Sequence, residues 1–572
     1  MKLFRQSQFF VIVIGTLALA ACLFAAGCGG SEELASNTFY YNEPDGLNTL
    51  DPARIGARAP WQIGGQIYRG LVGLDSALRP TPEIASSWTV SDDGRRWTFK
   101  LRRDVFFADD ACFAGGKGRA VTADDVRFSF ERILDPMTSS TGVWVFSGKV
   151  KGATEFIEAR AKDSNAVVHV TGFEVVDDST FVIELIDPFP PFLSILSMPY
   201  GYIVPREAIA KYGADFFRHP VGTGPFKLAE WSVDQRIVLV RNDRFAQKDA
   251  QGMKLPYLDS VVVSFLKESK TEFLEFKEGR FDAIATVDPA FSDEVFSTDG
   301  TSLTPGYSEY HLHATPAMSV VYYGLLIDSS RPGGAGSILA TNRQLRRAIN
   351  YAVDRESIVR YVLKGRASPG VHGPIPPGTP GYSGVEGYTF NRELARRLLD
   401  SAGYPNGKGL PELTLQISQN DRSAAVAEAL QDQLKTVGIR MQLKQVTFPQ
   451  HREMYLGGRL PFWGTSWLAD YPDAENFLSL FYSQFTPPSG NNTTGFSNAR
   501  VDSLYRATLG PSLTIEQRSA MYGQAERIIL DEAPWVILYY SVIQRLTQPS
   551  VSGYSVDPLD RLDLTRVRKK SI

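Results

Sequence analysis

The chain opens with an apolar segment and then changes to short alternating patterns. Residues 9–21 are apolar except for a Gly-Thr pair, and they follow the basic residues Lys2 and Arg5. A basic start followed by an apolar run and small residues is typical of a secretory signal. From residue 37 onward, runs typical of half-buried strands alternate with amphipathic helices. The pattern therefore predicts an α/β protein that follows an N-terminal secretory signal.

The clearest local patterns lie between residues 97 and 136. Residues 97–102 alternate large apolar and polar side chains, which predicts a strand with one buried face. Thr122 is placed to cap a helix with Asp125 at its third position, and Asp135-Pro136 ends that helix. The spacing thus predicts a strand, a loop and a capped helix in this order.

Further helices and strands follow in the second half of the chain. Helices are predicted over residues 342–352, 354–359, 391–401, 427–437 and 515–530, and strands over 412–417 and 440–446. Two Pro- and Gly-rich loops, 368–384 and 486–492, are long enough to lie at the rim of a cleft.

The apolar N-terminal run ends at Cys28, and a polar stretch follows. This arrangement resembles a bacterial lipoprotein signal, in which the Cys carries the lipid. Cys22 is the alternative, because Leu19 matches the usual cleavage pattern better. Cleavage there would leave apolar residues 23–26 at the mature start, where a solvated linker is expected. An uncleaved anchor is a third reading, since about 20 apolar residues span a bilayer.

Composition limits the classes of partner. The 572 residues suggest two to four domains at about 100–200 residues each. Lys and Arg number 60 against 63 Asp and Glu, so no basic field for nucleic acid is expected. If Cys28 is lipidated, Cys112 stands alone, no intramolecular disulfide is possible, and an inert thiol is expected.

A series of short segments gives the most specific signal. In order they are residues 50–52, 67–72, 82–88, 101–102, 122–126, 222–226, 241–242, 255–259, 345–350, 352–355 and 467–473. The series resembles the extracellular solute-binding proteins of family 5, the dipeptide, oligopeptide and nickel type that feed ABC importers. The resemblance covers about residues 37–540. Residues 108–121 depart from the family pattern and are predicted to form a lengthened surface loop.

The resemblance implies an α/β, two-lobed periplasmic-binding-protein-like fold of type II (large cluster C) with an inserted subdomain. The implied division is a signal peptide at 1–27, a linker at 28–36, lobe I at 37–75, 205–310 and 535–572, the inserted subdomain at 76–204, and lobe II at 311–534. The chain would cross between the lobes near residues 310 and 535, and these crossings would form a hinge around the ligand.

The resemblance also implies binding residues. Asp470 occupies the position at which peptide-binding members pair an Asp with the ligand's α-ammonium; the alternative is a helix cap near Asp473. Arg422, in a loop between a strand and a helix, would pair with a ligand carboxylate, or would be a solvated loop residue. The candidate aromatic lining residues, for which core packing is the alternative, are Trp467, Trp463, Tyr539 and Tyr540.

No catalytic, metal or cofactor site is predicted. His311 and His313 would share a strand face, but metal sites usually have three or four ligands. Carboxylates are too dispersed to pair, and no nucleophile motif is present. We therefore expect a binding protein and no enzyme.

The sequence predicts a lipid-anchored monomer of the periplasm or cell envelope. It would capture di- to oligopeptides and deliver them to an ABC permease and ATPase complex. Alternatives are the same fold with an oligosaccharide, a nickel chelate or an opine, or a secreted hydrolase on a similar scaffold.

Overall fold

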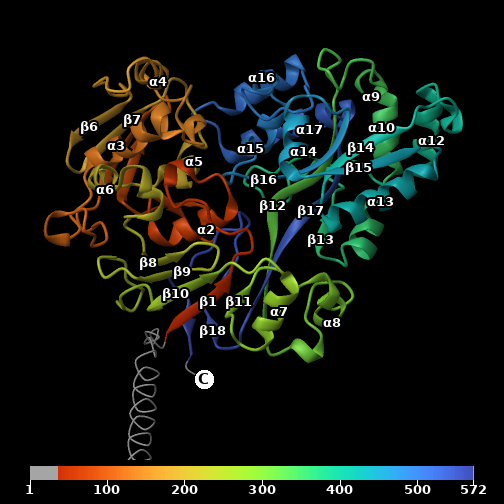
Figure 1. Ribbon diagram of the computed structural model, residues 1–572. Coiled ribbons are helices and arrows are strands. Elements are labelled where there is room, and N and C mark those ends of the chain that lie inside the picture. Colours follow the sequence, from red (N-terminus) through yellow and green to blue (C-terminus); the bar gives the residue numbers. More distant parts are fainter. Residues whose placement is uncertain (1–36, 571–572) are drawn as a thin grey trace, which may run out of the picture.

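The computed structural model describes residues 37–570. The predicted signal and the two candidate lipidation residues, Cys22 and Cys28, lie outside the described residues. The described chain forms two groups of helices and strands, joined by the long strands β12 (His311–Leu325) and β17 (Trp535–Thr547) (Figure 1). The predicted α/β class is confirmed.

One large sheet runs through both groups. Its path has the order β15 (Met441–Val446), β14 (Leu413–Ser418), β16 (Phe462–Leu468), β12, β17, β11 (Ala283–Ile284), β1 (Thr38–Asn42), β10 (Ser260–Ser264), β9 (Arg236–Arg241) and β8 (Phe226–Ser232), and β13 (Ala367–Pro369) pairs with β17 off this path. Because β12 and β17 lie in the middle, each group of elements builds on one half of the same sheet.

The two long strands form the connection between these halves. They pair antiparallel from His311 opposite Thr547 to Gly324 opposite Trp535, with a register shift after Pro316. Beyond them β11 lies beside β17 on one side, and β16 beside β12 on the other. The strands begin close to the crossings expected near residues 310 and 535. The exact division into lobes stays a prediction.

A separate four-stranded sheet lies within the segment predicted as the inserted subdomain. Its order is β4 (Ala85–Val90), β5 (Arg96–Leu101), β7 (Thr180–Glu184) and β6 (Phe173–Asp177), and the accompanying helices are α3 (Ala123–Leu134), α4 (Ala153–Lys162), α5 (Phe192–Leu196) and α6 (Arg206–Tyr212). Its apolar residues join one continuous core with those of β1, β9 and β10. The inserted segment is therefore packed onto the first group.

The remaining helices cover the large sheet. They are α2 (Arg58–Ile67), α7 (Ser269–Lys277), α8 (Ser292–Val295), α9 (Ile338–Thr341), α10 (Arg343–Ala352), α11 (Arg355–Ser357), α12 (Arg392–Ser401), α13 (Asp421–Lys435), α14 (Phe448–Leu456), α15 (Glu475–Leu478), α16 (Ala499–Thr508) and α17 (Ile515–Glu532). Short strand pairs β2 (Val72–Leu74) with β3 (Pro80–Pro82) and β18 (Val551–Ser552) with β19 (Arg568–Lys569) complete the regular structure. Separate apolar cores lie around α10, α12 and α13 and around α15, α16 and α17.

The local predictions can be compared with these elements. Thr122 and Asp125 form the predicted capping box of α3, which ends before Asp135. Helices α10, α12 and α17 confirm the predictions for their segments, with α17 two residues longer. The helix predicted over 427–437 starts at Asp421, because the side chain of Asn420 accepts the Ser423 N–H and caps it earlier.

Candidate functional site

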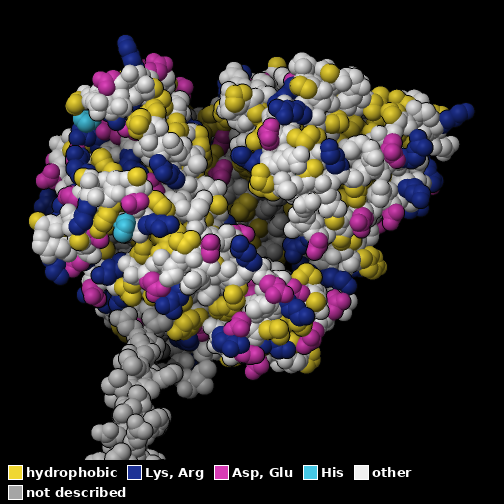
Figure 2. All heavy atoms as spheres, in the orientation of Figure 1, with side chains coloured by type: hydrophobic (Ala, Val, Ile, Leu, Met, Phe, Trp, Pro, Cys, Tyr) yellow, Lys and Arg dark blue, Asp and Glu magenta, His cyan; other side chains and the backbone are white. Residues whose placement is uncertain are grey.

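The carboxyl ends of two neighbouring parallel strands lie side by side at one edge of the large sheet. Strands β14 and β16 pair in parallel, with Gln416 opposite Trp463. Parallel strands present their carboxyl ends at the same edge, and ligands of open α/β sheets bind outside that edge. Residues 419–422 and 469–476 leave the two strands there. The surface is hollowed between the two halves of the molecule (Figure 2), so this edge is the candidate site.

Asp470 lies at this edge without a cationic partner. Its backbone N–H donates to Oδ1 of Asn476 at 3.2 Å, and Nε1 of Trp467 donates to the same oxygen at 2.9 Å. The carboxyl group is half-buried and forms no ion pair with any residue between 37 and 570. The pKa of Asp470 is raised to about 6, mainly because the carboxyl group is buried. A hydrogen bond with Asn476 lowers this pKa, and the charge of Glu475 raises it further.

The alternative role of Asp470 as a helix cap is wrong. Helix α15 has Ala474 at its N-cap position and no side-chain cap. Asp473 stabilises the turn before α15 instead, because its Oδ1 accepts the backbone N–H of Glu475 at 2.8 Å. Asp470 is therefore not engaged by the helix that follows it.

A buried network lies behind Asp470. Arg518 donates to both oxygens of Asp473, at 2.7 and 2.9 Å. Glu475 accepts hydrogen bonds from the hydroxyls of Tyr471 and Tyr505, each at 2.5 Å. These side chains are almost inaccessible to solvent. The network fixes the segment that carries Asp470, since each carboxylate and hydroxyl in it is hydrogen-bonded, and only Nε of Arg518 has no partner among the described residues.

The inserted segment approaches the same place from the opposite side. The ring of Trp144 lies 6.5 Å from that of Tyr471 in a stacked arrangement and 6.3 Å from that of Tyr200. Lys149 donates to the Trp144 carbonyl at 2.8 Å. Burial lowers the pKa of Lys149, and the charge of Glu475 raises it. Sequence reasoning missed these residues, because no local motif marks them.

The predicted aromatic residues are placed differently from one another. Trp467 is half-buried beside Asp470. Trp463 is fully buried and stacks on Tyr455, so it presents no surface to a ligand in this conformation. Tyr539 and Tyr540 are both buried and belong to separate cores, and the Tyr540 hydroxyl donates to the Gly373 carbonyl at 2.7 Å. A binding role for each of the four stays a prediction.

Arg422 lies in the first turn of α13, not in a loop as expected. The correction follows from the Asn420 cap described above. Its side chain is exposed and lines a hollow of about 170 Å³ between α13 and the C-terminal part of β17. Since α13 follows β14, Arg422 and Asp470 leave the same edge of the sheet.

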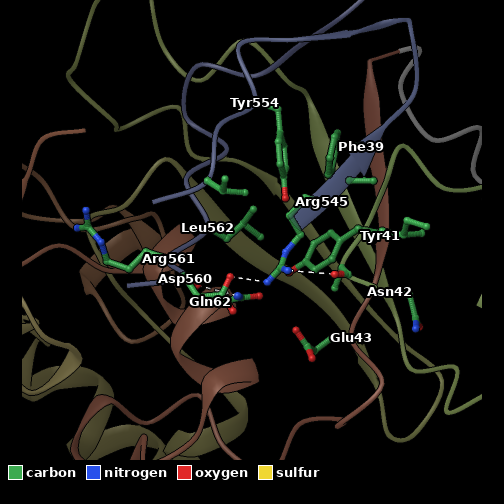
Figure 3. A pocket seen from close by; sticks show the side chains of 14 residues that line it. Phe39, Tyr41, Asn42, Glu43, Gln62, Arg545, Tyr554, Asp560, Arg561 and Leu562 are labelled. Carbon is green, nitrogen blue, oxygen red and sulfur yellow. Dashed lines mark hydrogen bonds and ion pairs between the residues drawn. The ribbon is translucent and has the colours of Figure 1, made fainter. Parts of the chain in front are cut away.

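A second polar hollow, of only about 20 Å³, lies at the end of β1 (Figure 3). Arg545 pairs there with Asp560, and Glu43 pairs with Arg58 at 2.5 Å. The volume suffices for about one water molecule. With its main charges already paired, this hollow is part of the fold and is too small for a peptide.

Other candidate chemistry finds no support between residues 37 and 570. This part of the chain has no group of three His, Cys, Asp or Glu placed to hold a metal, and none of its helices has the length and apolarity to span a membrane. His313 bonds to Thr547 at 3.0 Å. Burial, followed by Asp110, raises the pKa of the Cys112 thiol to about 12, as an unreactive thiol requires.

Comparison with curated proteins gives relatives over nearly the full length. The glutathione-binding protein GsiB of Salmonella choleraesuis is 28% identical over 549 residues, which cover 94% of this chain and 96% of that protein. GsiB of Escherichia coli O1:K1 is 28% identical over 563 residues, 97% of each chain.

Comparison with solved structures gives the same fold. A periplasmic oligopeptide-binding protein from Borrelia burgdorferi superposes with a TM-score of 0.73 at 26% identity, covering 93% of this chain and all of that one. The Escherichia coli murein tripeptide binding protein MppA is 22% identical and superposes with a TM-score of 0.73. The superposition covers 94% of this chain and all of the MppA chain.

These structures place the described residues in the two-lobed fold of periplasmic oligopeptide-binding proteins, as the sequence predicted. Residues 79–488 match the family described as "Bacterial extracellular solute-binding proteins, family 5 Middle". The match covers well over half of the 572 residues. The chain therefore belongs to family 5 of the bacterial extracellular solute-binding proteins.

Proposed function

We propose that this protein captures a peptide or peptide-like solute at the edge of β14 and β16 and delivers it to an ABC importer. The observation that carries the proposal is Asp470, a half-buried carboxylate without a cationic partner among the described residues. A carboxylate removed from water is costly unless a cation pairs with it. The α-ammonium of a peptide supplies that cation, and a charge-assisted hydrogen bond holds it.

The relatives support this class of ligand. They are binding proteins for glutathione, oligopeptides and a murein tripeptide, and an additional neighbour of the same fold, from Helicobacter pylori, is in complex with the peptide STSA. Peptides and glutathione share a free ammonium and a free carboxylate. We propose Asp470 for the ammonium and Arg422 for the carboxylate, with Trp467 against the first side chain.

The proposed mechanism is closure of the two halves around the ligand. The rings of Trp144 and Tyr471 already stack against each other across the hollow. The two strands that connect the halves, β12 and β17, are the places at which the molecule can bend. A ligand shifts such an equilibrium only by binding the closed form more tightly. An ion pair between Asp470 and an ammonium makes binding tighter in the closed form, because the attraction between the two charges becomes stronger when closure excludes water. No chemical step is required, so we propose a binding protein and no enzyme.

We also propose that the protein works as a monomer, lipid-anchored through Cys28, at the periplasmic or cell-envelope side of its membrane. Its partners would be the permease and ATPase of the importer. Metabolic labelling with a fatty acid tests the anchor: label should be lost in Cys28→Ser and retained in Cys22→Ser. The reverse pattern would move the anchor to Cys22, and label in both variants would contradict lipidation at a single one of these residues.

Native mass spectrometry of the protein purified without refolding tests the ligand class. Retained masses that fit peptides of two to five residues, or glutathione, are the expected result. A sugar, a metal chelate or an opine would keep the fold and overturn the peptide proposal. Turnover of an added peptide would contradict the assignment as a binding protein.

A further inference from the structure

The hollow beside Arg422 contains more positive charge than one carboxylate requires. Its wall is formed by residues 284–287, residues 542–546, Phe296, Arg366 and Arg422. Ile284 lies in β11, Arg422 in α13 and residues 542–546 in β17, whereas residues 285–287 follow β11, Phe296 follows α8 and Arg366 precedes β13. The hollow is therefore lined by segments that lie far apart in the sequence.

Two of its three arginines have no carboxylate partner between residues 37 and 570. Arg545 pairs with Asp560 and donates to the Ala285 carbonyl at 3.0 Å, so its charge is compensated. Arg366 has only a long hydrogen bond of 3.4 Å to the Leu363 carbonyl. Arg422 forms no ion pair in the described part of the chain.

Asp421, next to Arg422 in α13, is exposed and forms no ion pair between residues 37 and 570. The acidic groups beside Phe296, on the other wall of the hollow, are engaged elsewhere. Asp293 lies 3.5 Å from Lys364. Asp299 accepts from the Ser297 hydroxyl at 2.6 Å and from the Thr301 N–H at 3.1 Å. Two guanidinium groups thus face one hollow with no anion to separate them.

The environment of Arg366 shows the electrostatic consequence. Its guanidinium lies over the ring of Phe296, 5.7 Å from the centroid. Burial lowers the pKa of Arg366, and the charge of Arg422 lowers it further, against a rise from Asp293. An anion between the two arginines would relieve this repulsion. The N-terminus of α13, which begins at Asp421 beside Arg422, adds the positive end of a helix dipole.

The volume indicates a group larger than one carboxylate. In this measure about 10–15 Å³ holds one water molecule, so a hollow of about 170 Å³ has room for several atoms beyond a main-chain carboxylate. The small hollow at Arg545 and Asp560 shows the contrast, since there the charges are paired and little space remains.

We propose that Arg366 and Arg422 form a subsite for the acidic end of the ligand, with Arg422 on the main-chain carboxylate and Arg366 on a second, side-chain carboxylate. The ligand class is then a short peptide with a free ammonium at one end and two negative charges at the other. This inference rests on the proposed peptide-binding function and adds a specificity residue to it.

Isothermal titration with the tripeptides Ala-Ala-Glu and Ala-Ala-Gln tests the subsite. The wild type should bind Ala-Ala-Glu about tenfold more tightly, as one additional charge-assisted contact implies. Arg366→Gln should abolish this preference and leave the affinity for Ala-Ala-Gln within about twofold. Arg422→Gln should weaken both peptides. Arg397→Gln, on the exposed face of α12, is the matched control for net charge and should change neither.

The outcomes separate this inference from the function on which it rests. Equal affinity of the wild type for the two peptides would overturn the subsite and leave the peptide proposal standing. A preference retained in Arg366→Gln would overturn the role of Arg366. Failure of the wild type to bind either peptide would overturn the proposed function and the subsite with it.

Discussion

Asp473 and Asp470 lie three residues apart in the segment after β16, yet their electrostatic surroundings are opposite. Asp473 is buried and receives two hydrogen bonds from Arg518, with a third from the backbone of Glu475. Asp470 is half-buried and has no cationic partner between residues 37 and 570. The protein itself compensates the charge of Asp473, and we propose that a ligand compensates the charge of Asp470.

The same division holds for the arginines. Arg518 and Arg545 are paired with carboxylates, whereas Arg366 and Arg422 line the larger hollow without a carboxylate partner among residues 37–570. We therefore propose that the paired charges stabilise the fold and that the unpaired ones bind the ligand. Breaking a paired charge should therefore cost stability, and changing an unpaired one should alter binding.

The largest effect is expected for Arg518→Met. Removing one partner leaves Asp473 buried and uncompensated, which should lower the free energy of unfolding by about 3–5 kcal/mol. Chemical denaturation measures this loss. Arg500→Met, at an exposed position of α16, is the matched control and should stay within about 0.5 kcal/mol of wild type. A loss below about 1 kcal/mol in Arg518→Met would show that the network does not support the fold.

Asp470→Asn should have the opposite effect on stability. The pKa of Asp470 is raised in the folded protein, so folding binds a proton more tightly and the wild type loses stability as the pH rises through about 6. Asn resembles the protonated form and escapes this loss. The variant should equal wild type at pH 4 and exceed it by about 1–3 kcal/mol at pH 8. A less stable variant at pH 8 would show that a protein group already pairs with Asp470.

Peptide affinity should also depend on the ionisation of Asp470, but it should fall as the pH decreases. The ammonium needs the ionised carboxylate, which is lost as the pH falls through about 6. The affinity of the wild type for Ala-Ala-Ala should fall about tenfold between pH 7 and pH 5, or about 1.4 kcal/mol. Asp470→Asn should show a flat profile in the same titration. A fall of equal size in the variant would assign the pH dependence to another group.

The smallest effect is expected for Tyr540→Phe. The hydroxyl is buried and donates to the Gly373 carbonyl, so its loss should lower the free energy of unfolding by about 0.5–1.5 kcal/mol. Peptide affinity should not change through this hydroxyl, because the Gly373 carbonyl already accepts its hydrogen bond. A selective loss of affinity with unchanged stability would show that the hydroxyl contacts the ligand.

The sequence predicted the elements whose signals are local. The capping box at Thr122 and Asp125, the apolar spacing of α10 and α12 and the motif around Asp470 are each local in the sequence. Helix α13 shows where such signals fail. Its first buried residue is Val426, so the apolar pattern gave no sign of the turn that begins at Asp421.

The rest of the site depends on contacts between distant segments. Trp144 and Lys149 come from the inserted segment, and Arg366 becomes part of the hollow only when β13 pairs with β17. No spacing in the chain marks these residues. Charge balance in the folded structure identifies Arg366, because the missing partner is visible only after all neighbouring carboxylates have been assigned.

The central claim is that Asp470 binds the ligand's ammonium. Isothermal titration of wild type and Asp470→Asn with Ala-Ala-Ala and its N-acetylated form tests it most directly. We expect acetylation of the peptide and the Asp470→Asn change each to cost about 2–5 kcal/mol of binding free energy, and acetylation to cost almost nothing further in the variant. Equal costs of acetylation in both proteins would contradict the role of Asp470, since the ammonium would then be bound elsewhere.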